Sequence, residues 1–407
     1  MNNAFKSGLC ILILALTHQL SIAQTFTNYT TADGLLSNNV NCLSIDANDN
    51  IWFGTQAGIS FFDDILFTSY TTTSHPGLAD NNVVAIYAAD DGTIWAGTDF
   101  GLSYYNGTSW ATYTTADGLG DDRVKCITED ATGTIWIGTN DGVTSFDGAV
   151  WTSWGVSEGL PFGGVTHIEV HSSGTIYMGS GLGGVLVFNG STFNIITESE
   201  GLVNDKVRSI VIDAFDNKWV GTASGISVLN ASDVVSGSHT QIFQLPPPDT
   251  LNPVEDVVID NNGNIWAAVY VDYLVTEGGI SMYNGTYWRS YDISDGLIGP
   301  VVKQMAVDAS NELWITTSTG VSKMSGIPSN VDEMDNGTLE VYPNPSNQWL
   351  NVTVNPNAML TVFDLEGRII FSDQRSNTVR KIDVSQWACG IYVVSVGGIN
   401  KRVVVTD

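Results

Sequence analysis

One phrase recurs seven times along the chain: a valine, an acidic turn residue six positions later, and an aromatic residue eleven or twelve positions after the valine. The valines are Val40, Val84, Val124, Val165, Val207, Val254 and Val302. The aromatic residues, 41 to 48 positions apart, are Trp52, Trp95, Trp136, Tyr177, Trp219, Trp266 and Trp314. Such a period, with four short strands in each unit, is typical of a propeller blade. The sequence therefore predicts an all-β fold, a seven-bladed β-propeller over residues 24–325.

An outer-strand pattern, an aromatic residue followed by Gly-Leu or a degraded copy of it, also occurs seven times. The first copy begins at Phe26, before the first inner repeat, whereas the last inner repeat ends near Lys323 and has no copy after it. We therefore expect residues 26–31 to pair with the final blade, so that the N-terminal strand closes the ring. Closure would remove the exposed edges of an open stack of blades.

The turn positions carry Asp46, Asp90, Asp130, Asp213, Asp260 and Asp308, and the fourth repeat has His171 instead. The turns at residues 46–50 and 260–264 superficially resemble calcium loops, but they lack a distal bidentate glutamate and helical flanks. Asp and Asn also stabilise tight turns by bonding their own backbone. We expect turn roles and no cofactor, with calcium the one ion left open.

The two ends of the chain differ from the repeats. Residues 1–23 have the pattern of a signal peptide, with Lys6, an apolar run at residues 9–16 and small residues before Gln24. That run is shorter than the roughly 20 residues that span a bilayer, so no membrane span is expected. Residues 326–337 are polar and predict a linker, and residues 338–407 contain seven short alternating segments, which predict a small Ig-like β-sandwich.

The charge is concentrated in the front part of the chain. Residues 24–335 hold 8 Lys and Arg against 37 Asp and Glu, whereas residues 336–407 hold 6 of each kind. Such an acidic surface repels phosphate backbones and anionic lipids, so nucleic acid is excluded as a partner. Cations and neutral glycans remain open as ligands.

Propellers usually bind ligands at one mouth of the central channel, where loops converge. Loops that enter the first strand of a blade and loops that join its second and third strands lie on the same side. This candidate mouth gathers Asp99, Phe100, Arg123, Asn140 and Asp141, and the enlarged loop at residues 269–278 adds Asp272, Tyr273 and Glu277. Acids and an aromatic ring suit a sugar or a cation-assisted ligand. The alternative is that these residues are ordinary solvated side chains of the loops and bind nothing.

One strand of the fourth repeat carries His167, Glu169 and His171, which invites a metal ion. Residues four apart in a strand are separated by about 13 Å, so the two histidines cannot share one ion. We expect structural or turn roles and no metal site. The chain also lacks a Gly-x-Ser-x-Gly elbow, and His75 and His239 fall in apparent loops, so no catalytic residue is assigned.

Residues 118–124, 135–139 and 141–146 resemble the two-component regulator propeller repeat, which occurs in sensor regions of bacterial hybrid histidine kinases and in exported proteins. The resemblance covers roughly residues 24–325. It supports the propeller and says little about function. Signal transduction by this polypeptide is not expected, because a kinase sensor needs a membrane span and a catalytic half.

The tail resembles the type A sorting domain of type IX secretion, a Bacteroidota system, at residues 341–345, 362–367, 390–394 and 401–405. The residues that match its motif are Pro343, Asn344, Pro345, Gly367, Gly390, Tyr392 and Lys401. The resemblance implies passage through the periplasm and export by the type IX machinery, leaving the protein secreted or on the outer cell surface. A generic carbohydrate-binding sandwich is the alternative.

Together these features predict an exported, non-catalytic binding or interaction module whose ligand is an extracellular glycan or protein. The alternative is an extracellular lyase that acts on a glycan or lactone with a bound cation, since streptogramin lyases share the blade pattern.

Overall fold

The computed structural model describes residues 24–243, 252–270, 277–327, 341–342, 346–353, 360–364, 368–373, 379–396 and 399–406. The expected signal peptide and residues 328–337 of the expected linker lie outside these ranges. The chain divides into two compact units, Met1–Asn330 and Val331–Asp407. No helix in the described ranges is both long and apolar enough to cross a membrane.

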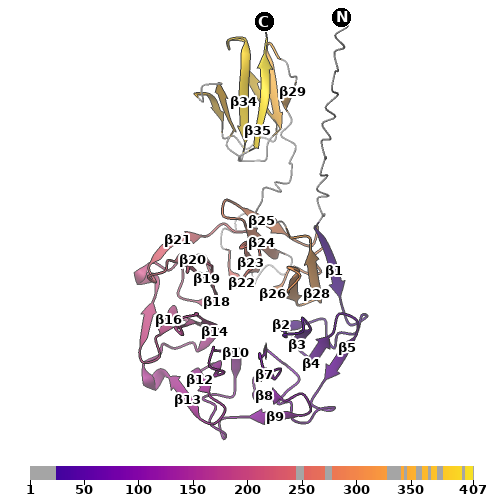
Figure 1. Cartoon of the computed structure of the whole chain (residues 1–407), viewed down its shortest axis with the longest axis vertical. Coiled ribbons are helices and arrows are strands. Elements are labelled where there is room, and N and C mark those ends of the chain that lie inside the picture. Colours follow the sequence, from indigo (N-terminus) through magenta and orange to yellow (C-terminus); the bar gives the residue numbers. More distant parts are fainter. Residues whose placement is uncertain are drawn as a thin grey trace, which may run out of the picture. The chain divides into compact units, whose positions relative to one another are not determined.

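The described part of the first unit forms seven four-stranded antiparallel sheets, which we call blades 1 to 7 (Figure 1). Blades 1 to 3 are β2 (Val40–Ile45), β3 (Ile51–Thr55), β4 (Gly58–Phe62) and β5 (Phe67–Tyr70); β6 (Ala85–Ala88), β7 (Ile94–Thr98), β8 (Gly101–Tyr105) and β9 (Trp110–Tyr113); and β10 (Val124–Glu129), β11 (Ile135–Thr139), β12 (Gly142–Phe146) and β13 (Trp151–Gly155).

Blades 4 to 6 follow the same order. They are β14 (Val165–Val170), β15 (Ile176–Ser180), β16 (Val185–Phe188) and β17 (Phe193–Ile196); β18 (Val207–Ile212), β19 (Lys218–Thr222), β20 (Gly225–Leu229) and β21 (Val235–His239); and β22 (Val254–Ile259), β23 (Ile265–Tyr270), β24 (Gly278–Tyr283) and β25 (Trp288–Tyr291). Two single turns of 3-10 helix, η1 (Val156–Glu158) and η2 (Glu198–Glu200), follow β13 and β17.

Blade 7 combines strands from both ends of the unit. It contains β26 (Val302–Val307), β27 (Leu313–Thr317), β28 (Val321–Ser325) and β1 (Thr25–Tyr29), and β1 is its outer strand. β1 runs antiparallel to β28, with Thr25 opposite Ser325 and Tyr29 opposite Val321.

Side chains of β1 reinforce this pairing. The Tyr29 ring stacks on Trp314 with ring centroids 5.7 Å apart. Asn28 accepts a hydrogen bond from Ser322 Oγ at 2.6 Å and donates one to the Gly296 carbonyl at 3.0 Å. The first strand of the described chain is therefore fixed to the last blade by backbone, aromatic and amide contacts.

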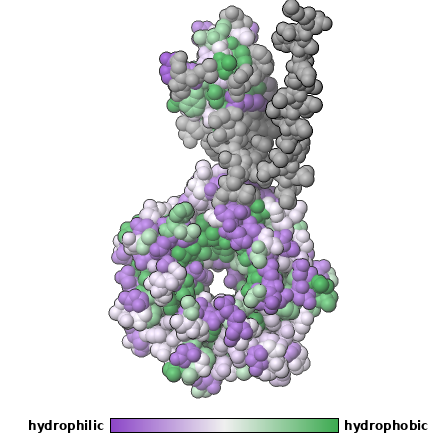
Figure 2. Space-filling model, in the orientation of Figure 1, coloured by the Kyte–Doolittle hydropathy of each residue, from purple (hydrophilic) through white to green (hydrophobic). Residues whose placement is uncertain are grey.

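The innermost strands surround a central opening, visible in Figures 1 and 2. In the order β2, β6, β10, β14, β18, β22 and β26, each packs against the next, and β26 packs against β2. The apolar cores lie between consecutive blades. One of them joins Leu43 and Phe53 of blade 1 to Trp314 and Val321 of blade 7.

In the second repeat, the structure corrects two sequence-based assignments by one position. Val83, which is fully buried, occupies the place of Val40, and the register of β6 against β7 makes Ala85 the counterpart of Cys42. The turn residue is therefore Ala89 and not Asp90. The Ala89 N–H donates to the Thr93 carbonyl, just as the Asp46 N–H donates to the Asn50 carbonyl in the first repeat. The sequence-based alignment shifted because two valines and two acids stand side by side.

The second unit contains two antiparallel sheets around one core. One is β29 (Val341–Tyr342), β30 (Trp349–Thr353) and β33 (Val379–Asp383). The other is β32 (Ile369–Asp373), β31 (Leu360–Asp364), β34 (Gly390–Val396) and β35 (Ile399–Val405). Leu350 and Ile382 from the first sheet meet Val362, Val394 and Val403 from the second in one buried cluster. The described part of the tail thus contains seven strands, as many as the short alternating segments expected there.

Candidate functional site

Each innermost strand except β6 has an irregularity at its start, where Val40 pairs with Thr55 but Cys42 pairs with Gly54. The same shift occurs in β10, β14, β18, β22 and β26. An extra residue of this kind bends a strand and re-aims its side chains. The residues two positions after the repeat valine are Cys42, Ala85, Cys126, His167, Ser209, Asp256 and Gln304.

From blade 4 onward these side chains bond a backbone amide of the next blade. His167 Nδ1 accepts from the Ile210 N–H at 3.3 Å, and Ser209 Oγ accepts from Val257 at 3.1 Å. Asp256 Oδ2 accepts from Met305 at 2.7 Å. The series ends with the amide of Leu43 in blade 1, which donates to Gln304 Oε1 at 2.9 Å. These bonds give a hydrogen-bond acceptor to backbone N–H groups at the edges of the innermost strands. At an unpaired strand edge such groups would have no partner in the protein.

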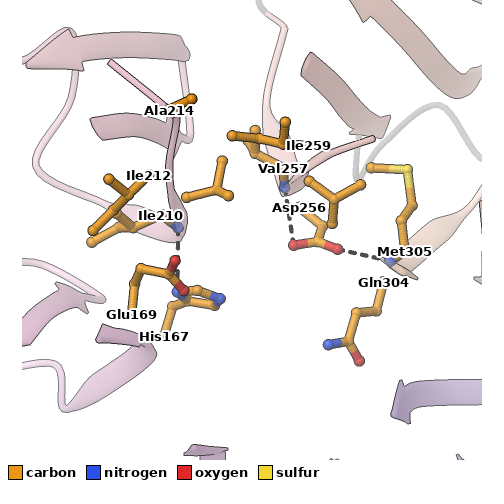
Figure 3. A pocket seen from close by; sticks show the side chains of 12 residues that line it. His167, Glu169, Ile210, Ile212, Ala214, Asp256, Val257, Ile259, Gln304 and Met305 are labelled. Atoms are coloured by element: carbon orange, nitrogen blue, oxygen red, sulfur yellow. Dashed lines mark hydrogen bonds between the residues drawn. The ribbon is translucent and has the colours of Figure 1, made fainter. Parts of the chain in front are cut away.

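A cavity of about 350 Å³ opens between the inner strands of blades 4 to 7 (Figure 3). His167 and Glu169 line it from β14, Asp256 from β22, and Gln304 and Met305 from β26. The remaining residues at the cavity are apolar: Ile210, Val211, Ile212, Ala214, Val257, Val258 and Ile259. Of these, Ile210 and Val257 are buried in the cores between blades. The space-filling view shows hydrophobic surface bordering the central opening (Figure 2). The exposed lining of the site thus mixes polar and apolar atoms in nearly equal parts, with the polar side chains at fixed places.

Burial changes the charge of these groups. Burial raises the pKa of Glu169 from 4.5 to about 7. The hydrogen bond that this carboxyl accepts from the Ile212 N–H lowers the pKa, but by less. Burial also raises the pKa of Asp256 from 3.8 to about 6, against the bonds from Met305, Ser209 and Val257. Burial lowers the pKa of His167 from 6.5 to about 4. Near neutral pH the imidazole is therefore uncharged, and its proton lies on Nε2 because Nδ1 accepts from Ile210.

The candidate mouth includes one compact charged group. Arg123 forms an ion pair with Asp121 at 2.8 Å, and this bond, with added attraction from Asp99 and Asp141, raises the pKa of Arg123. Asn140 donates its N–H to the Arg123 carbonyl at 3.1 Å. The structure therefore brings Asp99, Arg123, Asn140 and Asp141 together at the junction of blades 2 and 3.

The other candidate mouth residues are more dispersed. Phe100 stands in the turn between β7 and β8 with 65% of its surface exposed. Glu277 directly precedes β24 and is half-buried. Asp272 and Tyr273 lie outside the described residues.

His171 does not join His167 and Glu169. It replaces the turn acid of blade 4, where Nδ1 lies 2.6 Å from Ser173 Oγ and Nε2 lies 3.1 Å from Asp216. No group of three or more His, Cys, Asp or Glu side chains suited to a metal ion occurs in the described ranges. The described turn acids bond their own turns, as in Asp46, which accepts the amides of Asn48 and Asn50.

Sequence reasoning did not single out Asp256 and Gln304. The available signal was the position two residues after each repeat valine, which is apolar or a thiol in blades 1 to 3 and polar in blades 4 to 7. Aligning the repeats on that column would have indicated a polar sector of the channel.

Two protein families match parts of the chain. The two component regulator propeller repeat matches residues 34–57, 77–100 and 118–141. The secretion system C-terminal sorting domain matches residues 340–406. The chain carries propeller repeats and a sorting tail. That tail marks the chain for export by type IX secretion, either to the cell surface or into the medium. Of its motif residues, Gly390 and Tyr392 lie in β34 and Lys401 in β35, whereas Pro343, Asn344, Pro345 and Gly367 fall outside the described ranges.

Solved structures share the fold at low identity. An extracellular domain described as part of a hybrid two component system, BT3049 from B. thetaiotaomicron, is 20% identical with a TM-score of 0.62, covering 91% of this chain and 52% of that one. PorZ, a surface component of the type-IX secretion system of Porphyromonas gingivalis, is 16% identical with a TM-score of 0.58, covering 92% and 60%. The chain thus spans little more than half the length of these two.

A streptogramin B lyase is 12% identical with a TM-score of 0.57, and the match covers 74% of this chain and 97% of the lyase. No curated protein matches the chain. At these identities the similarities establish an all-β, propeller-like fold and do not transfer a function.

Proposed function

We propose that the chain is an exported, non-catalytic binding propeller of seven blades, closed by its N-terminal strand, that acts at the cell surface or outside the cell. In this proposal residues 1–23 are a signal peptide, 24–325 the propeller, 326–337 a linker and 338–407 the sorting sandwich. The observation that carries the binding role is the cavity of about 350 Å³ beside Glu169 and Asp256, in a chain that also has an export tail.

Two contacts support seven blades closed by β1. The Leu43 amide donates to Gln304 Oε1, which links the inner strand of blade 7 to that of blade 1. At the outer edge of blade 7, β1 pairs with β28 and is the fourth strand of the sheet. In the described ranges, no strand of the first unit follows β28 in the chain and could take that place.

The contacts of the described histidines favour binding over the alternative, a lyase. A general base needs an unprotonated nitrogen facing its substrate. His167 uses Nδ1 to accept from Ile210, and His171 is held by Ser173 and Asp216. His239 Nδ1 accepts from Trp288 Nε1 at 3.2 Å, and its ring stacks on Trp219. His75 Nδ1 lies 2.9 Å from Ser74 Oγ.

The candidate mouth remains part of the proposal as a second contact area for an extracellular glycan or protein. The cluster of Arg123 with Asp99 and Asp141, beside the exposed ring of Phe100, could contact a ligand at the rim.

Two experiments test this function. Deleting residues 338–407 should retain the protein in the periplasm, and secretion of the shortened chain at the normal level would contradict the sorting role. The secreted full-length protein is then applied to a glycan array with and without calcium, and the supernatant is searched for unsaturated products. Binding without new products supports the module, whereas turnover would support the lyase.

A further inference from the structure

The channel cavity combines features that select one kind of small molecule. Its volume of about 350 Å³ falls at the lower end of small-molecule sites, which range from about 300 to 1,000 Å³. It is too small for a folded partner. Ile212 of β18 and Ile259 of β22 are partly exposed at the cavity, so the hydrocarbon part of a bound molecule has apolar side chains to contact.

The two carboxyl groups lie on different blades, Glu169 on β14 and Asp256 on β22, with the apolar residues of β18 between them along the ring (Figure 3). No lysine or arginine is among the described residues that line the cavity. The basic residues near the lining residues in sequence have other partners: Arg208 pairs with Glu255, and Lys303 bonds Asn39 and Asn41. A negative charge in the cavity therefore has no protein counter-ion close by.

Hydrogen bonding leaves the two carboxyl groups in different states. Asp256 accepts from Ser209 Oγ and from the amides of Val257 and Met305, so its oxygens are well supplied. Glu169 accepts the amide of Ile212. An ionised carboxylate offers about four acceptor positions, so Glu169 retains capacity for a donor inside the cavity.

We propose that this cavity binds a small apolar primary amine, with the ammonium group donating to Glu169 and the hydrocarbon part lying against the partly exposed side chains of Ile212 and Ile259. The inference rests on the proposed binding function and names its ligand class. An ammonium ion supplies the missing positive charge and three donors, and its hydrocarbon part can cover the partly exposed isoleucines of the cavity. An anion is excluded, because it would face Glu169 and Asp256 without a cation.

The test uses the mature full-length protein and isothermal titration calorimetry with hexylammonium chloride. Hexan-1-ol and sodium hexanoate serve as neutral and anionic probes of the same length. We expect hexylammonium to bind at least about tenfold more tightly than hexan-1-ol, since a charge-assisted hydrogen bond is roughly twice as strong as a neutral one. Equal affinity for the amine and the alcohol, or no binding of the amine, would overturn the proposal.

Glu169→Gln is the diagnostic variant, because the amide oxygen can still accept from Ile212 while the charge is lost. It should weaken hexylammonium binding about tenfold and leave hexan-1-ol unchanged. Glu129→Gln is the matched control: Glu129 ends β10 in blade 3, accepts from the Asp90 amide and does not line the cavity. Thermal melts verify that both variants fold, and equal weakening by the two substitutions would refute a local site.

Calcium chloride is titrated in parallel. Calcium binding that disappears in Glu169→Gln, without amine binding, would identify a divalent cation as the occupant and overturn the proposal. If the amine fails to bind while the secreted protein still captures a glycan, this inference fails and the proposed function stands. If the protein is not exported, the proposed function fails independently of the titration.

Discussion

The indole Nε1–H of Trp136 donates to Asp130 Oδ2 at 2.8 Å and ties the second strand of blade 3 to the turn before it. The same side chain of Asp130 accepts the amides of Thr132 and Thr134. One carboxylate therefore stabilises the turn and satisfies a buried indole. Equivalent bonds of 2.9 to 3.2 Å join Trp52 to Asp46, Trp219 to Asp213, Trp266 to Asp260 and Trp314 to Asp308.

Blades 2 and 4 depart from this bond in different ways. In blade 2 the turn position is Ala89, and the buried Nε1 of Trp95 has no hydrogen-bond partner among the described residues. In blade 4 the aromatic residue is Tyr177, whose hydroxyl donates to Asp233 of blade 5 at 2.8 Å. The Tyr177 hydroxyl thus finds its carboxylate acceptor in a neighbouring blade, because the turn of its own blade has no acid.

Ala89→Asp should stabilise the front unit. The new carboxylate would accept the Trp95 indole N–H and the turn amides, and satisfying a buried donor is worth about 1 kcal/mol. The free energy of unfolding, measured by urea denaturation, should rise by that amount. Ala149→Asp adds the same charge to the exposed turn after β12 and should have no such effect. An unchanged or lower stability of Ala89→Asp would show that the unpaired indole N–H of Trp95 does not lower the free energy of unfolding.

The repeat period predicted most of this fold. In the third repeat, for example, the four short strands expected in each unit are present as β10 to β13, because each has a strong hydrophobic pattern bounded by turn residues. The prediction slipped by one position in the second repeat, where Val83 and Val84 are adjacent and periodicity alone does not distinguish them. Burial decided the choice, since Val83 is fully buried.

The site was harder to predict than the fold. Cross-blade bonds such as that from Ile210 to His167 join residues 43 positions apart, and the local sequence carries no sign of them. His167 and Glu169 were identified on one strand, but their relation to Asp256 depends on how blades are arranged around the channel. Chain direction was enough to assign loop residues such as Asp99 to one side of the ring. It did not predict that Asp99 lies near the ion pair of Arg123.

Removing residues 24–31 should destabilise the entire front unit and not only its first strand. β1 completes blade 7, and Tyr29 packs on Trp314 in a core shared with blade 1. We expect the single cooperative thermal transition to fall by roughly 5 °C or more, since about 1 kcal/mol shifts the midpoint by roughly 2–4 °C in domains of this size class. Asn28→Ala, which removes only side-chain bonds, should cause a smaller shift. A shortened protein that melts like the full one would refute closure by β1.

His167 and Glu169 should give opposite pH dependences of stability. The lowered pKa of His167 makes the folded state bind fewer protons than the unfolded state between about pH 4 and 6.5, so its contribution rises with pH. The raised pKa of Glu169 makes the folded state bind more protons between pH 4.5 and about 7, so its contribution falls with pH. The two contributions offset each other where the windows overlap.

Substituting either residue should expose the other contribution. In Glu169→Gln, the free energy of unfolding should increase with pH, relative to the unmodified protein, by up to about 1.4 kcal/mol per pH unit between pH 5 and 6.5. In His167→Gln, which keeps an acceptor for Ile210, it should decrease with pH by a similar amount. Urea denaturation at half-unit intervals of pH measures both slopes, and parallel curves for the three proteins would show that neither group titrates abnormally.

Lys218 forms the best-buried ion pair in the described part of the chain. Only 1% of its side chain is exposed, Nζ lies 3.1 Å from both Asp216 and Asp233, and it stands over the Tyr177 ring. Bonds from these partners raise the pKa of Lys218 in spite of its burial. Lys218→Met would leave the two carboxylates without their cation. Because both carboxylates are partly exposed, the loss of unfolding free energy should be smaller than the roughly 3–5 kcal/mol that breaking a fully buried pair costs.

Salt separates this pair from a surface one. Because the Lys218 side chain is buried, the loss of unfolding free energy in Lys218→Met should persist in 1 M sodium chloride, where exposed pairs are screened. Arg123→Met is the matched control: it removes the exposed ion pair with Asp121 and should leave the stability unchanged at either salt concentration. If the loss in Lys218→Met vanished at high salt, the ammonium group would have to be in contact with solvent, contrary to its burial.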